Sequence, residues 1–190
     1  MGKGRIEVWM RRPRKGPPDS LKRETVIEYG RRFGLGTLIE TGTFHGKMIK
    51  GVIGRFGKIY SIDIAQHLID EVSKWVPSHV ELICGDSSVE LPKLLNNIDK
   101  RVLFWLDAHW CKNESGKGPV NCPILEELDT IFKHPYGHVL LMDDARLYGK
   151  DGWPTISEVR AKVLSVKPDW WFDVKNDIIR AHAFNHLCVI

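Results

Sequence analysis

Acidic residues end the apolar runs of this 190-residue chain, at positions where an ordinary hydrophobic core needs no charge. In chain order they are Glu40, Asp63, Asp86, Asp107 and the pair Asp143-Asp144. A carboxylate there can accept hydrogen bonds from a ribose hydroxyl or an adenine amino group, and several together can hold a divalent cation. Because open α/β sheets bind ligands at the carboxyl ends of their strands, we expect these acids to serve one ligand site.

A glycine turn surrounds the first acid, in the segment Glu40-Thr-Gly-Thr-Phe-His-Gly46. Gly42 and Gly46 allow a tight turn and a close approach of the backbone to a ligand. A dinucleotide fingerprint needs a further glycine where this chain has Phe44, and a pyrophosphate would be repelled by Glu40. A ligand with a ribose, a cationic centre and an amino-acid end suits the acid better, and S-adenosylmethionine fits that description. The alternative is that both glycines serve only helix–strand packing.

The second and third acids complete the predicted nucleoside site. Asp63, at the tip of its strand, is placed to accept hydrogen bonds from two ribose hydroxyls. Asp86 is expected to accept from an adenine amino group while Ser87 caps the next helix, although Asp86 could itself be that cap. The predicted cofactor-binding residues are Glu40, Thr41, Gly42, Thr43, Gly46, Asp63, Asp86, Ser87 and Asp107.

The last three acids predict a metal site. Asp107 follows Val102-Leu-Phe-Trp-Leu106, and the pair Asp143-Asp144 follows Val139-Leu-Leu-Met142. Carboxylates that meet repel one another unless a proton or a cation neutralises them. An all-oxygen set favours a hard ion such as Mg²⁺ over zinc. The alternative for the pair is a turn-forming and helix-capping role.

Short apolar runs and helical patterns alternate along the chain, which is typical of a parallel sheet with helices on both faces. The predicted strands are 37–41, 58–63, 80–84, 102–107 and 138–142, and the predicted helices are 20–33, 45–55, 65–75, 88–97, 122–133 and 155–165. Strand formers at 170–174, 178–183 and 186–190 predict an antiparallel hairpin that closes the sheet. We therefore expect an α/β, Rossmann-like, doubly wound sheet.

At these motifs the chain resembles the class I S-adenosylmethionine-dependent methyltransferases. It is most similar to the metal-dependent O-methyltransferases of the catechol, caffeoyl-CoA and macrocin types, over roughly residues 36–149. In those enzymes an acid after the fourth strand and an acidic pair after the fifth hold magnesium. The resemblance implies that Asp107, Asp143 and Asp144 are the metal ligands here.

The resemblance also implies a proton acceptor. The stretch Leu106-Asp-Ala-His-Trp-Cys-Lys112 is similar to the Asp-His-Trp-Lys of the catechol enzymes, whose lysine is the base, with one extra residue before His109 and another before Lys112. The predicted catalytic residues are Asp107, His109, Lys112 and Asp144. Loops 108–121 and 144–154 are expected to present a small hydroxylated acceptor, with His109, Trp110 and Trp153 lining its pocket.

Charge and composition set the context. The chain is 43% hydrophobic and 27% charged, as expected for one globular domain at 20–190, and its net charge of +4 comes from a basic N-terminal arm at 1–19 and the helical segment that follows. No apolar stretch suits a signal peptide or a membrane span, so a cytoplasmic protein is expected. The cysteines have no C-x-x-C spacing, which favours free thiols.

The sequence is also compatible with other functions. The basic arm could hold nucleic-acid phosphates in a nucleic-acid methyltransferase, although the Asn/Asp-Pro-Pro-Tyr/Phe motif of many amino-methylating enzymes is absent. The fold could also serve a non-catalytic nucleotide-binding module, a metal-dependent hydrolase or an NAD-dependent oxidoreductase. The arm and the apolar segment Leu187-Cys-Val-Ile190 could each support a homodimer contact.

Overall fold

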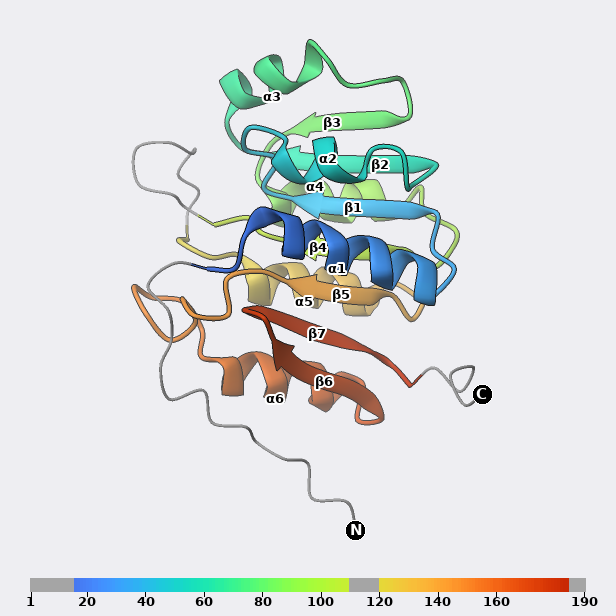
Figure 1. Ribbon diagram of the computed structural model, residues 1–190. Coiled ribbons are helices and arrows are strands. Elements are labelled where there is room, and N and C mark those ends of the chain that lie inside the picture. Colours follow the sequence, from blue (N-terminus) through green and yellow to red (C-terminus); the bar gives the residue numbers. More distant parts are fainter. Residues whose placement is uncertain (1–15, 110–119, 185–190) are drawn as a thin grey trace.

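The computed structural model describes residues 16–109 and 120–184. Over this part of the chain, one seven-stranded sheet has the order β3-β2-β1-β4-β5-β7-β6 (Figure 1). The strands are β1 (Thr37–Thr41), β2 (Lys58–Asp63), β3 (Val80–Cys84), β4 (Leu103–Leu106), β5 (Val139–Met142), β6 (Trp170–Lys175) and β7 (Ile178–Ala183). The predicted doubly wound α/β sheet is confirmed.

The strand order reverses between β1 and β4. Strands β1 to β5 are parallel, and β7 is antiparallel to both β5 and β6, as the predicted closing hairpin requires. The chain first winds outward from β1 through β2 to β3, then returns to place β4 on the other side of β1. A ligand crevice forms at such a switch point, beyond the carboxyl ends of the strands. The acids at the carboxyl ends of β1 and β2 and those that follow β4 and β5 therefore lie along one edge of the sheet.

Helices cover both faces of the sheet (Figure 1). They are α1 (Asp19–Arg32), α2 (Lys47–Val52), α3 (Gln66–Ser73), α4 (Ser87–Leu95), α5 (Ile124–Lys133) and α6 (Ile156–Val166). One core lies under α1 and α2 and includes Val26 and Ile49, whereas the other lies under α4, α5 and α6 and includes Leu91 and Leu128. Because β4 and β5 are buried on both faces, their sequences are continuous apolar runs.

The observed boundaries differ from the predicted ones mostly by one or two residues. The largest difference is at the helix expected over 45–55, which spans only Lys47–Val52. Gly46 precedes it with φ of 67°, a left-handed conformation that cannot continue a helix, so the helix begins after it. The expected strand at 186–190 lies outside the described residues, as does most of the basic arm. Within the described ranges, no helix is long and apolar enough to span a bilayer.

Candidate functional site

Gly42 brings the turn after β1 against the end of β4. Its φ is 88°, and a Cβ added there would lie 2.5 Å from the carbonyl oxygen of Asp107. Its own N–H donates to the carbonyl of Ile62 at 2.8 Å, which ties the turn to β2 as well. Only glycine fits both the conformation and the space. The predicted close approach at this turn is therefore present, and it joins the turn to the loop that carries Asp107.

Glu40 lies near the end of β1, buried beneath the glycine turn that follows the strand. It is 1% exposed, and it accepts a hydrogen bond from the Ser61 hydroxyl, which is itself 2.7 Å from the Thr43 hydroxyl. Burial raises the pKa of Glu40 to about 8, with a smaller opposing effect of the Ser61 hydrogen bond. A carboxyl with that pKa is mostly neutral at pH 7. The charge argument by which the sequence excluded a pyrophosphate is therefore weakened, and the missing glycine at Phe44 becomes the stronger reason.

The buried Glu40 predicts an unusual pH dependence of stability. A carboxyl whose pKa rises from 4.5 to about 8 on folding keeps its proton in the native state after the unfolded chain has lost it. The stability it contributes is complete below about pH 4.5 and is lost as pH rises towards 8. Because of Glu40, the free energy of unfolding of the wild type should fall by about 2–4 kcal/mol between pH 5 and pH 8. We expect this fall to be absent in Glu40→Gln.

Urea unfolding at several pH values measures this effect. Glu126→Gln on the exposed face of α5 is the matched control, and its free energy of unfolding should change with pH as that of the wild type does. If the free energy of unfolding of Glu40→Gln changes with pH as that of the wild type does, Glu40 does not hold a proton in the folded protein.

Asp63 ends β2, and its side chain accepts hydrogen bonds from two backbone segments, the turn after β1 and the start of the loop after β2. One carboxylate oxygen accepts from the N–H of Phe44 at 2.8 Å, and the other accepts from the N–H of Ala65 at 2.9 Å. Each oxygen keeps a second lone pair that can accept from a ribose hydroxyl. The predicted ribose contact stays a prediction, and Asp63 has the added role of fixing the conformation of Phe44, whose φ is 47°.

Asp86, rather than Ser87, caps α4. Its carboxylate accepts from the N–H of Ser88 at 2.9 Å and from the Ser88 hydroxyl at 2.7 Å. The expected division, in which Ser87 caps the helix and leaves Asp86 free, is wrong because the carboxylate reaches the N–H two residues ahead. Whether Asp86 also contacts adenine stays a prediction.

A buried polar group that the sequence did not indicate lies beneath this region. Glu127 of α5 is 1% exposed, and burial raises its pKa to about 7, while the nearby Ser87 and Thr41 hydroxyls oppose the rise. Among the described residues, Glu127 Oε1, Ser87 Oγ and Thr41 Oγ1 have no well-formed hydrogen bond. These three side chains interact with one another in the interior, since both hydroxyls act on the Glu127 carboxyl.

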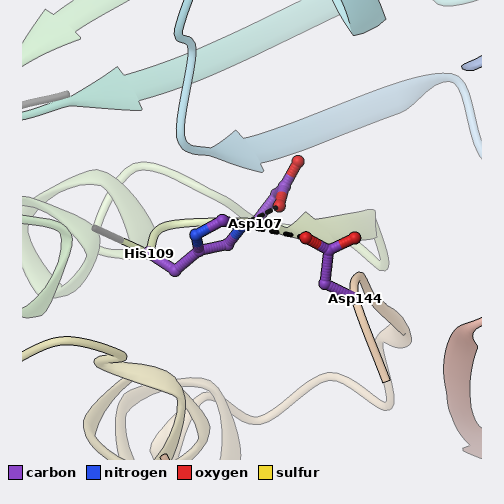
Figure 2. Close-up of side chains that lie close together, drawn as sticks. All are labelled: Asp107, His109 and Asp144. Carbon is purple, nitrogen blue, oxygen red and sulfur yellow. Dashed lines mark ion pairs between the residues drawn. The ribbon is translucent and has the colours of Figure 1, made fainter. Parts of the chain in front are cut away.

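Asp107, His109 and Asp144 converge from the ends of β4 and β5 (Figure 2). His109 Nε2 lies 3.2 Å from Asp107 Oδ1 and 3.2 Å from Asp144 Oδ2. One ligand atom from each of the three residues can be chosen so that all lie within 4.8 Å of one another. Two ligand atoms about 2.1 Å from one ion lie about 3.0 Å apart at a right angle and about 3.4 Å apart at a tetrahedral angle. The three side chains therefore have the chemistry and the spacing of a divalent-cation site.

Lys22 of α1 reaches the same acids from the other side. Its Nζ forms an ion pair with Asp143 and a second one with Asp144 at 3.1 Å. Burial alone would lower the pKa of Lys22, but the carboxylates of Asp143 and Asp144 outweigh it and raise that pKa. Burial and the charges of Asp107 and Asp144 raise the pKa of Asp143 well above its usual range, against the opposing effect of Lys22. Asp143, predicted as a metal ligand, is thus placed against a lysine and is not part of the three-residue cluster.

Asp144 is held by cationic groups on several sides. Arg146 donates to Asp144 Oδ1 at 2.6 Å and also pairs with Asp177 in the turn between β6 and β7. Burial would raise the pKa of Asp144, but the His109 hydrogen bond, Lys22 and Arg146 hold it well below its usual range. Asp144 is therefore a fixed carboxylate at neutral pH.

A small pocket opens beside the cluster. Its lining includes Asp107, His109, Glu127, Asp143 and Trp153. The rings of His109 and Trp153 have centroids 4.9 Å apart, so these two residues, which we expected at an acceptor pocket, do lie together. Lys112 and Trp110 lie outside the described residues.

Solved structures that match this fold include methyltransferases, whereas no protein-family model and no curated protein matches the sequence. The O-methyltransferase TomG from Streptomyces achromogenes, in complex with S-adenosylmethionine, has a TM-score of 0.61 at 14% identity, covering 87% of this chain and 80% of that one. An O-methyltransferase from Bacillus cereus with S-adenosylhomocysteine has a TM-score of 0.61 at 13% identity, covering 90% and 84%.

The likeness extends to a different methyl acceptor. The N-methyltransferase NodS from Bradyrhizobium japonicum WM9, with S-adenosylhomocysteine, has a TM-score of 0.55 at 12% identity, covering 90% of each chain. At these identities the similarity concerns the fold and leaves the acceptor open. The chain has the fold of the class I S-adenosylmethionine-dependent methyltransferases.

Proposed function

We propose that the protein is an S-adenosylmethionine-dependent methyltransferase that methylates a hydroxyl group of a small molecule. The observation that carries this proposal is the contact between the Gly42 turn and the Asp107 carbonyl, since it joins the turn expected to hold the methyl donor to the Asp107–His109–Asp144 cluster. A cofactor bound along the turn and an acceptor at the cluster would be neighbours. Methyl transfer needs that adjacency, because acceptor oxygen, methyl carbon and sulfur must be in line.

The cofactor side of the crevice supplies orientation. The turn at Gly42 exposes backbone to the amino-acid end of the ligand, Asp63 accepts from the ribose, and Asp86 lies at the adenine end. These contacts would fix the sulfonium relative to the cluster.

The acceptor side supplies charge and a route for the proton. Asp107 and Asp144 flank His109 Nε2, so either carboxylate can orient the imidazole or an acceptor hydroxyl. A divalent ion, if held by Asp107 and Asp144, would lower the pKa of the acceptor hydroxyl as ions do for bound water. The proton would pass to His109 or to Lys112. Trp153 and Tyr148, whose rings are in edge contact, would exclude water from the apolar side of the pocket.

Replacing Asp144 tests the assignment of the cluster. We expect Asp144→Asn to lower turnover at least a hundredfold while the affinity for S-adenosylmethionine changes less than threefold, because the residue faces the acceptor and not the donor. Asparagine tolerates the observed φ of 54°, so the backbone should be kept. The measurement is S-adenosylhomocysteine release with a panel of phenols, sugars and polyketides, using variants verified by thermal unfolding.

Three other results would redirect the proposal. Turnover of Asp144→Asn equal to wild type would remove the cluster from the chemistry. Release with amine acceptors alone would assign N-methylation in place of O-methylation. A steep loss of RNA or DNA affinity with rising salt would favour a nucleic-acid acceptor.

A further inference from the structure

The turn that joins β6 to β7 contains two residues in the left-handed conformation. Lys175 and Ile178 pair across the hairpin, and the residues between them, Asn176 and Asp177, have φ of 53° and 64°. Glycine is the usual residue at the second position of such a turn, and aspartate is tolerated there. The turn itself therefore does not require the Asp177 carboxylate, which is available for contacts elsewhere in the molecule.

Asp177 contacts the loop after β5 at three points. Its carbonyl oxygen accepts from the N–H of Ala145 at 2.8 Å, one carboxylate oxygen accepts from the N–H of Arg146 at 2.7 Å, and the other forms an ion pair with the Arg146 guanidinium. The side chains of Arg146 and Asp177 are 19% and 12% exposed, so the pair is largely shielded from solvent. A hairpin turn at the edge of the sheet thus holds the loop that carries Asp144.

The same guanidinium continues this connection to the Asp107–His109–Asp144 cluster. Arg146 Nη1 donates to Asp144 Oδ1 at 2.6 Å and also to Asp177, so it bridges the two carboxylates. The second oxygen of Asp144, Oδ2, lies 3.2 Å from His109 Nε2 (Figure 2). Asp144 has φ of 54°, a conformation that persists in a residue other than glycine only where its surroundings enforce it. Asp177 supplies part of that enforcement, because its contacts begin at the next residue in the chain.

Lys22 does not duplicate the bridge. Its Nζ lies 3.1 Å from Asp144 Oδ1, but it belongs to α1 and also pairs with Asp143. Two cations from different elements therefore contact Asp144 Oδ1, and only Arg146 is held by Asp177. Loss of the Asp177 carboxylate would leave Asp144 with its charge and with Lys22, but without the contact that fixes the guanidinium beside it.

We infer that Asp177 is a positioning residue for the proposed reaction, because through Arg146 it fixes the direction in which Asp144 presents Oδ2 to His109. This inference rests on the proposed function and adds to it a residue from outside the cluster. Without Asp177, the guanidinium loses one of the two carboxylates that it bridges, and Asp144 loses its fixed orientation. The effect on turnover should be smaller than that of removing the Asp144 carboxylate itself.

Nuclear magnetic resonance of the histidine ring nitrogens reports the position of Asp144 without any acceptor. The His109 signals are identified by their absence in His109→Asn. We expect Asp177→Gly, which suits the turn, to shift the His109 signals and to leave those of His138 in place, since His138 precedes β5 at the other end of that strand. Asp177→Asn keeps an acceptor for the Arg146 N–H, so it should give a smaller shift of the same kind.

The role of Arg146 is tested by a double variant. Arg146→Met should shift the His109 signals as well, and Asp177→Gly added to Arg146→Met should shift them no further, because Asp177 acts through Arg146. Asn176→Gly is the matched control, since it changes the other left-handed position of the same turn and leaves the Asp177 carboxylate in place. Its His109 signals should match those of the wild type.

Turnover is measured on the same variants. We expect Asp177→Gly to lower kcat about tenfold and to change the affinity for S-adenosylmethionine less than threefold, because a misplaced Asp144 affects the acceptor side alone. Asn176→Gly should match wild type in both. A purely structural role would lower the thermal stability of Asp177→Gly and leave the His109 signals of the folded protein where they are.

Unmoved His109 signals in Asp177→Gly would overturn the inference whatever the turnover, as would a further shift when Asp177→Gly is added to Arg146→Met. Shifted signals with wild-type turnover would also overturn it, because the orientation of Asp144 would then be irrelevant to the reaction. Shifted signals in protein that neither binds S-adenosylmethionine nor transfers a methyl group would instead contradict the proposed function, and would still establish that Asp177 positions Asp144.

Discussion

Gly42→Ala is expected to weaken the binding of S-adenosylmethionine at least thirtyfold. The added Cβ would lie 2.5 Å from the Asp107 carbonyl oxygen and 2.8 Å from its carbonyl carbon, which are backbone atoms that cannot turn away as a side chain does. The φ of 88° is also strained for alanine, at a cost of about 1–3 kcal/mol. The turn after β1 must therefore separate from the end of β4, and this separates the predicted donor site from the cluster.

Calorimetry and thermal unfolding measure the two parts of this effect. Gly54→Ala is the matched control, because an added Cβ there would point into open space and its φ lies outside the left-handed range. That variant should bind like wild type. If Gly42→Ala is destabilised yet binds S-adenosylmethionine with unchanged affinity, the turn is structural and the donor lies elsewhere.

Lys22→Met is expected to destabilise the protein by about 3–5 kcal/mol. The Asp143 side chain is 1% exposed and Lys22 is its direct cationic partner, so the substitution leaves Asp143 buried beside Asp107 and Asp144 without that partner, and it must take up a proton to stay there. Removing one member of a buried pair costs far more than removing an exposed one. A loss of this size would show that the contact of Lys22 with Asp143 and Asp144 holds α1 against the sheet.

A double-mutant cycle separates this pair from general effects of the substitution. Lys22→Met combined with Asp143→Asn should lose about 1–3 kcal/mol less than the sum of the single variants, because the second change removes the acid with which Lys22 pairs. Lys47→Met is the control, since its pair with Asp19 has side chains 64% and 52% exposed and should be worth under about 0.5 kcal/mol. Additive losses in Lys22→Met and Asp143→Asn would rule out the proposed coupling.

The architecture could be predicted because its signals are local. Strands β4 and β5 are buried on both faces, which requires uninterrupted apolar runs, and β1 is followed by a turn that only glycine can make at Gly42. The hairpin of β6 and β7 follows from strand formers without an intervening helix. Each of these features leaves a mark in the local sequence, so sequence pattern is sufficient to predict them.

The contacts within the site could not be predicted in the same way. Lys22 is one of four basic residues in α1 and has no distinguishing pattern around it, and only the docking of α1 on the sheet brings it to Asp143 and Asp144. The raised pKa of Glu40 depends on complete burial, which a strand end does not reveal. In the sequence, Glu127 cannot be told from an ordinary acid in the first turn of α5, although its side chain lines the pocket. Each of these features depends on tertiary packing.

Titration of S-adenosylmethionine into the purified protein by calorimetry tests the central claim most directly. Wild type should bind one equivalent with micromolar affinity, and Asp63→Ala, which removes the predicted ribose acceptor and the hydrogen bonds to Phe44 and Ala65, should weaken binding at least tenfold. Absence of binding to folded wild-type protein, with or without added divalent ion, would contradict the methyltransferase proposal and leave a binding module or a hydrolase on this fold as the account to pursue.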